Sequence, residues 1–443
     1  MSTIPANPPA VIPTTSNPTE QPRERRVSFQ LDSGKLVETV YSPTNGLQFW
    51  VQGKIEPDDH AQHGRLEIEP EYGLKTFAEQ KIVGFPAFPA EYTSTANLIH
   101  EIRQFVARYA DLPDEVLAIV SLYVLMTWVY DRFRAVPYLR FLGEPGTGKT
   151  RVLEVTSAIS YKGLKMSGSI TGAALFRTID LVQGTIAVDE GDFKSSAEWS
   201  DITKVLNNGY AAGTPVIRCN KNTFEPECFR VFGPKIISTR SRFDDEATES
   251  RCLTFETSER PVSKHIPLQL PPAFDREALI LRNKLLKWRF DNFLNIEAKE
   301  NDLRDGLFAR TAQIGASLMA VVPDESWKAK LLAFLHHMDE GRNESGEKGA
   351  IKRALQTLAA GGWKSATIKE ISERVNQERS DLGLDPLSPK RIGLILRSLG
   401  YSPKRKNSGY FVPLAAGGEN EAVPAFRLLP KSGEHAASEA VNV

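Results

Sequence analysis

Apolar residues recur with two different periods along this chain, and the change of period marks where strands give way to helices. Residues 27–92 hold short runs in which apolar and polar residues alternate, as in strands, and the turn residues at 43–46 (Pro-Thr-Asn-Gly) predict a hairpin. Residues 93–134 follow helical spacing, with one helix near 96–109 and a second opening at Pro113, a residue suited to a first helical position. We therefore expect a small β-rich module followed by a helical linker.

Residues 135–260 alternate apolar runs with helical stretches, which predicts an α/β core. The runs at 136–142 and 163–167 are short, and the run at 184–190 is continuously apolar until two carboxylates end it. A strand has this composition when its neighbours bury both of its faces, as they do in parallel sheets. We expect a parallel sheet with helices on its faces.

The remainder of the chain is helical in pattern until a final hairpin. Residues 261–346 follow helical spacing, and residues 347–414 predict three helices and then two strands. Thr367 with Glu370 forms a capping box that opens the second of these helices, and Ser388 caps the third. Helix, helix, helix and β-wing is the order of a winged-helix domain.

Composition limits the class of protein without indicating its function. Of the 443 residues, 41% are hydrophobic and 25% are charged, with a formal net charge of zero, which is ordinary for a soluble globular protein. Three cysteines are too few for a disulfide framework and indicate a reducing compartment. No signal-peptide pattern is present, and the uncharged run 116–130 is too short to span a membrane, so we expect a cytoplasmic protein without membrane contact. Polar composition predicts disordered tails over residues 1–26 and 415–443.

The segment after the run 136–142 carries the most specific motif of the chain. It reads G-x-x-x-x-G-K-T, the pattern of a phosphate-binding loop, in which glycines let backbone N–H groups approach the phosphates. Lys149 is expected to reach the β- and γ-phosphates of ATP, and the Thr150 hydroxyl to bind Mg²⁺. The expected nucleotide-binding residues are Gly143, Glu144, Pro145, Gly146, Thr147, Gly148, Lys149, Thr150 and Asp189.

Asp189 and Glu190 end the apolar run that follows the phosphate loop. Ligands in open α/β sheets bind at the carboxyl ends of the strands, where such side chains emerge. Asp189 is expected to hold Mg²⁺, and Glu190 to orient and deprotonate the attacking water. A solvated acidic turn is the alternative, but the pair stands 40 residues after Lys149, a spacing that favours the ATP site.

These motifs resemble those of the AAA+ ATPase superfamily. The resemblance implies an AAA+ core over residues 135–260, a helical lid over 261–346, and a ring of subunits, most commonly six, that hydrolyses ATP at subunit interfaces. It also implies a polar sensor at the end of a further strand. Thr239 in Lys-Ile-Ile-Ser-Thr-Arg is the preferred sensor, and Ser238 and Arg240 remain alternatives.

The resemblance further implies an arginine finger that reaches the γ-phosphate of a neighbouring subunit. Arg251 in Glu-Ser-Arg-Cys is the preferred finger, because the competing Arg242 follows Thr239 too closely to stand across the domain. Arg282 is a candidate second sensor in the lid. An ordinary surface arginine is the alternative for each of these positions.

Two segments are candidates for DNA contact. AAA+ helicases that thread DNA carry an extra hairpin before the sensor strand, and a similar hairpin is predicted around Lys221, with Arg218 and Arg230 as further phosphate contacts. A plain surface hairpin is the alternative. In the winged helix, Lys348 to Val412 holds 13 Lys/Arg against 5 Asp/Glu, a local charge of +8. The expected contacts with DNA there are Lys390, Arg391, Arg397, Lys404, Arg405 and Lys406.

The sequence thus predicts a ring-forming ATPase coupled to DNA, of the helicase or replication-initiation type found in phages, plasmids and mobile elements. A loader or regulator that binds DNA without unwinding it is one alternative, and a remodeller of protein partners is another. A winged helix can also serve as a protein-contact domain.

Overall fold

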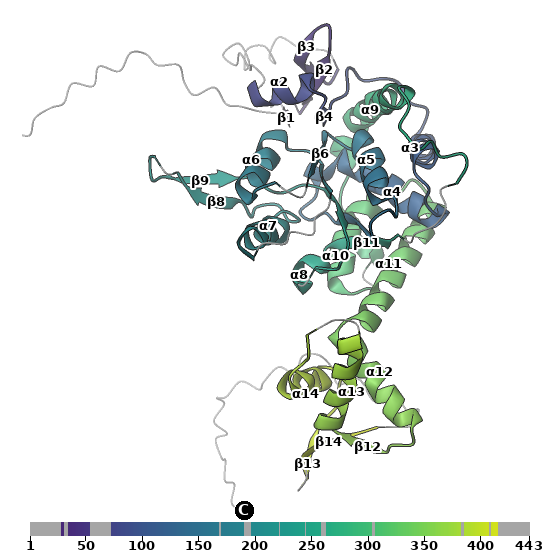
Figure 1. The fold of residues 1–443 in the computed structure, drawn as a ribbon. Coiled ribbons are helices and arrows are strands. Elements are labelled where there is room, and N and C mark those ends of the chain that lie inside the picture. The colour runs from purple at the N-terminus through teal and green to yellow at the C-terminus, as the bar shows by residue number, and fades with distance from the viewer. Residues whose placement is uncertain are drawn as a thin grey trace, which may run out of the picture. The chain divides into compact units, whose positions relative to one another are not determined.

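The computed structural model divides into two compact units, residues Met1–His336 and His337–Val443 (Figure 1). It describes residues 28–30, 34–53, 72–167, 170–189, 196–220, 222–243, 245–257, 263–303, 306–381, 385–406 and 409–414.

A six-stranded sheet forms the centre of the first unit. Its order is β11-β5-β10-β7-β6-β4, and every neighbouring pair is parallel except β4 with β6. Because β10 lies between β5 and β7, the carboxyl ends of these three strands meet at one edge of the sheet. The strands are β4 (Val83–Gly84), β5 (Tyr138–Leu142), β6 (Gly163–Ser167), β7 (Ile186–Asp189), β10 (Lys235–Thr239) and β11 (Cys252–Glu256).

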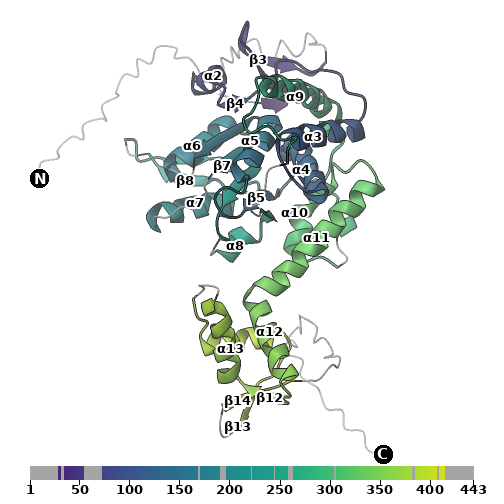
Figure 2. The same cartoon turned by 45° about the vertical axis from the view of Figure 1, so that its right-hand side comes forward.

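Helices cover the sheet on both faces, as its continuously buried strands require (Figure 2). The second helix of the predicted linker ends at Thr127, and the indole N–H of the buried Trp128 that follows donates to the Ile159 carbonyl at 3.0 Å. The helices of this unit are α2 (Tyr72–Glu79), α3 (Thr95–Tyr109), α4 (Asp114–Thr127), α5 (Lys149–Ile159), α6 (Gly172–Val182), α7 (Ser196–Asn208), α8 (Glu246–Glu249), α9 (Ala273–Asn292) and α10 (Ala309–Met319), with short 3₁₀ turns η1 (Tyr130–Arg132), η2 (Phe293–Asn295) and η3 (Asn301–Leu303). The helix α11 (Glu325–Ser345) contains the boundary between the two units.

The N-terminal segment packs onto this core through a buried cluster of charges. Its small antiparallel sheet is β1 (Ser28–Gln30), β2 (Leu36–Ser42) and β3 (Gly46–Val51), and β2–β3 is the predicted hairpin. Glu38 on β2 accepts a hydrogen bond from Arg289 Nε at 2.7 Å and lies 3.7 Å from Lys162 Nζ. Burial lowers the pKa of Lys162 to about 8, although the charge of Glu38 opposes the shift. Removing one partner of such a cluster leaves an uncompensated buried charge, so these contacts hold the segment against α9 and the core.

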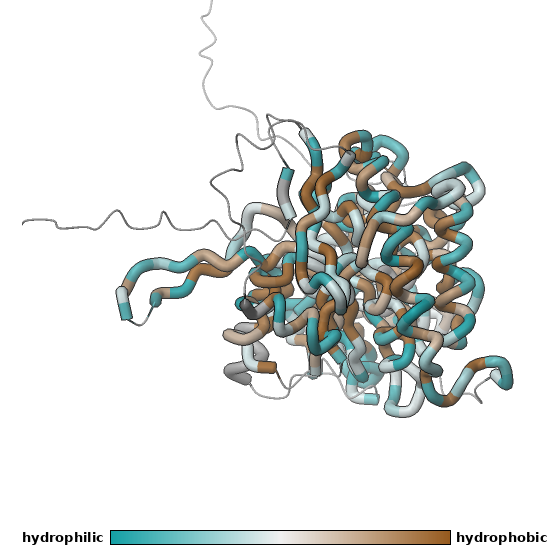
Figure 3. Tube along the Cα trace, turned by 90° about the horizontal axis from the view of Figure 1, so that it is seen from above, coloured by the Kyte–Doolittle hydropathy of each residue, from teal (hydrophilic) through white to brown (hydrophobic). Residues whose placement is uncertain are grey.

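The hairpin predicted before the sensor strand is present as β8 (Val216–Cys219) and β9 (Pro226–Phe229). It extends away from the body of the unit, and hydrophobic and hydrophilic segments alternate along it (Figure 3).

The second unit has the predicted order of elements, with one additional short strand. A three-stranded sheet of order β12-β14-β13 packs with three helices. The capping box is confirmed: Glu370 Oε2 accepts from the Thr367 backbone N–H at 2.7 Å, and Thr367 Oγ1 accepts from the Glu370 N–H at 3.2 Å. Ser388 caps the third helix by accepting from the Arg391 N–H at 3.2 Å. The elements are α12 (Glu347–Ala360), β12 (Ser365–Thr367), α13 (Ile368–Asp381), α14 (Pro389–Ser398), β13 (Lys404–Lys406) and β14 (Gly409–Pro413).

Within the described ranges, none of the helices combines the length and the apolar composition that crossing a membrane requires.

Candidate functional site

The predicted phosphate loop joins the end of β5 to the start of α5. Gly146 and Gly148 have φ of +84° and +86°, a backbone conformation that glycine adopts without strain. A Cβ on Gly143 would lie 2.4 Å from the Thr257 carbonyl oxygen, so only glycine fits there. The loop thus wraps tightly and leads directly into the N-terminus of a helix, as phosphate binding requires.

Lys149 lies across the mouth of this loop. Its ammonium donates to the carbonyl oxygens of Gly143 at 2.5 Å and Glu144 at 2.7 Å. Thr147 fixes the other side of the loop, because its hydroxyl donates to the Glu144 carbonyl at 2.8 Å and lies 2.7 Å from Thr257 Oγ1. Two backbone carbonyls of the loop therefore hold the Lys149 ammonium at its mouth.

Asp189, the last residue of β7, accepts hydrogen bonds from side chains of α5 and β10. Its Oδ1 accepts from Thr150 Oγ1 at 3.1 Å and from Ser238 Oγ at 2.6 Å. A carboxylate beside a hydroxyl is the oxygen-rich donor set that Mg²⁺ prefers, so Thr150 and Asp189 fit this ion. Glu190, the expected water-activating residue, lies outside the described residues.

The three sensor candidates occupy different environments at the end of β10. Ser238 contacts Asp189 directly, whereas the Thr239 hydroxyl is buried and has no hydrogen-bond partner among the described residues. Both residues and Arg240 line a cavity of about 440 Å³ together with Lys149, Thr150 and Asp189. Because side chains alternate along a strand, Ser238 and Thr239 face opposite ways, and the direct contact belongs to Ser238.

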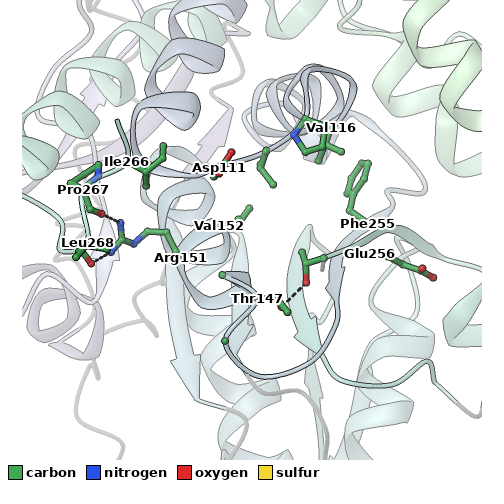
Figure 4. Close-up of a pocket in the computed structure, with 15 residues that line it drawn as sticks. Asp111, Val116, Thr147, Arg151, Val152, Phe255, Glu256, Ile266, Pro267 and Leu268 are labelled. Atoms are coloured by element: carbon green, nitrogen blue, oxygen red, sulfur yellow. Dashed lines mark hydrogen bonds between the residues drawn. The ribbon is translucent and has the colours of Figure 1, made fainter. Parts of the chain in front are cut away.

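A second, largely apolar cavity of about 240 Å³ adjoins the phosphate loop (Figure 4). Val116, Val152 and Ile266 point into it from three separate segments, and Phe255 closes one side. Arg151 anchors the nearby loop by donating to the carbonyls of Pro267 at 2.8 Å and Leu268 at 2.7 Å. The sequence analysis missed this cavity, because its lining residues are ordinary apolar positions far apart in the chain.

Arg242 and Arg251, the two finger candidates, lie in different surroundings. Arg242 is half-exposed and pairs with Glu249 at 3.0 Å and with Glu256 at 2.8 Å. Arg251 is only 8% exposed, and its Nη1 donates to Asn207 Oδ1 at 2.5 Å. Arg251 is therefore covered by its own chain.

A buried arginine connects the phosphate-loop strand to the segment before β11. Arg140 on β5 is fully buried and binds Glu249 with both ends of its guanidinium, at 2.6 Å for Nη1 to Oε2. Burial raises the pKa of Glu249, but the hydrogen bond and charge of Arg140 outweigh it, so the pKa lies below its ordinary value. The carboxylate therefore stays ionised and ties the two segments together.

The guanidinium of Arg282, the second-sensor candidate, donates hydrogen bonds to backbone carbonyls. It donates to Phe85 at 3.0 Å and to Ala158 at 2.6 Å, and burial lowers its pKa to about 10. It lines a cavity of about 730 Å³ beside β4 and β6, which also reaches Asp189.

The candidate DNA contacts of the hairpin are mostly engaged with their own chain. Arg218 lies over the Phe176 ring at 5.4 Å, and Arg230 pairs with Asp180 at 3.3 Å. Lys221 lies outside the described residues. The hairpin tip instead presents Phe224, which is 79% exposed.

In the second unit, the basic residues of α14 and β13 lie mostly on the surface. Lys390 and Arg397 are exposed on one face of α14 with Leu394 between them. Arg391 is exposed as well but pairs with Glu347 at 2.8 Å. Lys404 and Arg405 are exposed on β13, and the backbone of Lys406 continues this strand.

No protein-family model matches this chain. No curated protein matches it either. Among solved structures, it is similar to the active helicase Cch of SCCmec type IV, with 11% identity, coverage of 88% of this chain and 92% of that chain, and a TM-score of 0.43. It is also similar to the C-terminal region of NrS-1 in its A form without ligand, with 15% identity, coverage of 74% and 77%, and a TM-score of 0.34. Both likenesses are too low to transfer a function.

Proposed function

We propose that this protein is a Mg²⁺-dependent ATPase of the AAA+ type that couples hydrolysis to DNA. The observation that carries the proposal is the convergence of Lys149, Thr150, Asp189 and Ser238 at one sheet edge, beside an apolar cavity that suits a nucleotide base. The test is the rate of ATP hydrolysis by the full chain with and without single- and double-stranded DNA. Absence of hydrolysis under all three conditions would refute the proposal.

Each residue of this site has a distinct part in the proposed reaction. The loop N–H groups and Lys149 bind and orient the phosphates, and Thr150 with Asp189 would hold Mg²⁺, which neutralises phosphate charge when bound. Glu190 accepts a proton from the attacking water. Because Ser238 contacts Asp189 directly, we propose Ser238 rather than Thr239 as the sensor.

We further propose that the chain works as a ring, with six subunits as the expected number, and acts as a helicase or in replication initiation. A loader or regulator that does not unwind DNA is the alternative. If unrelated protein partners, rather than DNA, stimulate hydrolysis, the protein-remodelling alternative holds.

The hairpin tip is a candidate contact for single-stranded DNA. Phe224 has φ of +60°, a backbone conformation that is energetically unfavourable for a residue with a bulky side chain. Hydrogen bonds within the turn hold its backbone in this conformation. Its N–H donates to the Asn220 carbonyl at 2.8 Å, and Cys219 Sγ donates to its carbonyl at 3.1 Å. The chain thus leaves an aromatic ring exposed at the hairpin tip, where nucleotide bases can stack on it.

Phe224→Ala should weaken binding of single-stranded DNA by about 5- to 150-fold, because one base–aromatic stack is worth about 1–3 kcal/mol. The salt dependence of binding should stay unchanged, because no phosphate contact is removed. The measurement is a titration of a fluorescent oligonucleotide at several salt concentrations. Phe88→Ala, at a phenylalanine that is 50% exposed, is the matched control and should bind as the parent does. Unchanged affinity in Phe224→Ala would exclude the tip as a contact.

The second unit is proposed to bind duplex DNA as a winged helix. Six of its basic residues lie on α14 and β13, which are the two elements that meet groove and backbone in such domains. Wing charges mainly contact phosphates, which carry no sequence information.

Replacing Lys404, Arg405 and Lys406 together with alanine should therefore weaken DNA binding regardless of sequence. Each lost phosphate contact lowers the slope of log K against log salt by about 0.9, so the slope should fall by roughly 2 to 3. Hydrolysis of ATP without DNA should be unchanged. The measurement is a duplex titration at several salt concentrations, with a Lys348/Lys352/Lys369→Ala variant as the control of equal charge. Superimposable duplex-binding curves for the parent and the wing variant would indicate that this unit is a protein-contact domain.

A further inference from the structure

Lys235, the first residue of β10, is a fully buried lysine at the base of the hairpin β8–β9. Its ammonium donates to three backbone carbonyls: Val231 at 2.9 Å, Gly233 at 3.0 Å and Gly209 at 3.2 Å. Gly209 follows α7 and precedes the hairpin, whereas Val231 and Gly233 come after it. One ammonium therefore joins the chain that enters the hairpin to the chain that leaves it. We call these four residues the hairpin root.

The hairpin root is closely packed around the ammonium. A Cβ on Gly209 would lie 2.5 Å from Lys235 Nζ and 2.5 Å from the Val231 carbonyl oxygen, so only glycine fits there. The ammonium also lies over the ring of Tyr138 on β5, at 4.9 Å from its centroid. The hydroxyl of Tyr138 donates to the Leu206 carbonyl near the end of α7 at 2.6 Å. The ammonium is thus held in one place between β5, α7 and β10.

The number of acceptors at the hairpin root matches the protonated form of lysine. An ammonium has three N–H donors, which is one for each carbonyl. A neutral amine has two N–H donors and would direct its lone pair at the third oxygen. Loss of the proton would therefore break one of the three links and set a lone pair against a buried carbonyl.

The hairpin also contacts α6. Phe229 packs against Phe176 with ring centroids 4.7 Å apart, and Arg230 pairs with Asp180 at 3.3 Å. The arginine of this pair is exposed, and exposed ion pairs contribute little. Lys235 adds the side-chain link between the hairpin and β10, the central strand of the sheet.

We infer that Lys235 is a positioning residue whose ammonium fixes the hairpin at its root and so holds Phe224, at the tip, in place for a nucleotide base. The inference rests on the proposed contact of the tip with single-stranded DNA. The hairpin extends away from the body of the unit (Figure 1), so a small rotation at the root displaces the tip by a larger distance. A tip that is already held in place loses less conformational freedom when it binds.

The same geometry makes the position of the tip depend on pH. Burial lowers the pKa of Lys235 from the ordinary 10.5 to about 7. Two tyrosines face this lysine among the described residues: Tyr138 lies under its ammonium, and the Tyr123 hydroxyl on α4 donates to its carbonyl at 2.9 Å. Burial raises the pKa of both tyrosines well above the ordinary value, so neither changes charge near neutrality.

The remaining neighbours of Lys235 in the described part of the chain do not titrate. Carbonyl oxygens face its ammonium from the end of α7 and from residues 231–233. The other side chains around a small cavity beside Lys235 come from α6, β7, α7 and β10 and are all aliphatic: Leu175, Ile186, Val188, Ile202, Leu206 and Ile237. The root should therefore loosen as the pH rises through about 7 because Lys235 itself loses a proton.

The first test compares the effect of Phe224→Ala on binding of a fluorescent single-stranded oligonucleotide in two backgrounds. This effect, about 5- to 150-fold in the parent, should shrink toward none in Lys235→Met, which keeps the apolar stem without the charge or the donors. In the parent the effect should also shrink as the pH rises through about 7, whereas in Lys235→Met it should not vary with pH. The ratio of affinities with and without Phe224→Ala at each pH cancels the influence of other titrating groups on binding.

A second measurement follows the hairpin without DNA. Cys219 and Cys228 on the hairpin are exposed, and Cys252 is buried. Cys219→Ser therefore leaves Cys228 as the site for a nitroxide label, and the serine can still donate to the Phe224 carbonyl that Cys219 Sγ contacts at 3.1 Å. The mobility of the label, measured by electron paramagnetic resonance, should rise as the pH passes about 7 and should be high at every pH in Lys235→Met.

Thermal stability separates positioning from folding. Because the pKa of Lys235 is lowered by folding, the unfolded chain binds more protons between pH of about 7 and 10.5, and this group adds stability as the pH rises through that range. The melting temperature of the parent relative to Lys235→Met should therefore rise while the effect of Phe224→Ala falls. A merely structural lysine would move both in the same direction. Lys162→Met removes another buried lysine of the unit and, as the matched control, should keep the parental effect of Phe224→Ala.

The outcomes distinguish the inference from the proposed function. If folded Lys235→Met keeps the parental label mobility and the parental effect of Phe224→Ala, the inference is wrong. If Lys235→Met does not fold, the pH series of the parent decides, and constant label mobility through pH of about 7 overturns the inference. If label mobility responds as expected but Phe224→Ala leaves DNA binding unchanged, Lys235 fixes the root as inferred and the proposed contact of the tip with DNA is refuted.

Discussion

Lys149→Ala should lose ATP binding almost completely. The ammonium now donates to two loop carbonyls, at 2.5 and 2.7 Å, and phosphate oxygens would take over these hydrogen bonds as charged acceptors. Two hydrogen bonds to charged groups, at about 1.5–3 kcal/mol each, correspond to a loss of roughly 10²- to 10⁴-fold in affinity. Equilibrium titration with a fluorescent ATP analogue measures this directly.

The control for this prediction is Lys287→Ala. Lys287 is a partly exposed lysine of the same unit that pairs with Asp291 at 2.7 Å, so its loss removes equal charge without touching the loop. Parental affinity in Lys149→Ala would show that the loop does not hold phosphate through this residue. Thermal melts of both variants separate lost binding from lost folding.

Glu190→Gln should retain ATP binding and lose turnover by about 10²- to 10⁴-fold, the range of general-base catalysis. The amide keeps the size of the side chain but cannot take a proton from water. Lys149, Thr150 and Asp189 remain, so the phosphates are still held. Steady-state phosphate release together with the binding titration measures the two effects separately.

Two further variants make this prediction specific. Glu91→Gln changes a glutamate whose side chain is 87% exposed and should hydrolyse ATP like the parent. Asp189→Asn weakens the ligand set for Mg²⁺ and should raise the Mg²⁺ concentration needed for turnover, which Glu190→Gln should not do. Parental turnover in Glu190→Gln would place the water-activating group elsewhere.

Local features of the chain were predictable because neighbouring residues determine them. The strand, glycine-rich turn and helix around Lys149 follow from apolar residues, glycines and helix formers in immediate succession. The capping box at Thr367 and the hairpin β8–β9 depend equally on residues a few positions apart. Backbone conformation and hydrogen bonds over such short distances are set by the sequence alone.

The division of roles between similar residues could not be predicted in the same way. Ser238 and Thr239 are adjacent and chemically alike, and only the placement of β10 between β5 and β7 turns Ser238 toward Asp189. The apolar cavity beside the phosphate loop is likewise lined by Val116, Val152 and Ile266, which come from segments far apart in the chain.

Arg251 and Arg310, which both lie over the ring of Tyr210, show the same limit most clearly. The sequence around Arg251 matches a known motif, whereas Arg310 stands in an ordinary helix with no motif near it. Packing covers Arg251 and brings Arg310, which lies 59 positions later in the chain, beside it. A motif specifies residue types, but exposure, charge balance and distance between remote residues arise only when the chain has closed around its core.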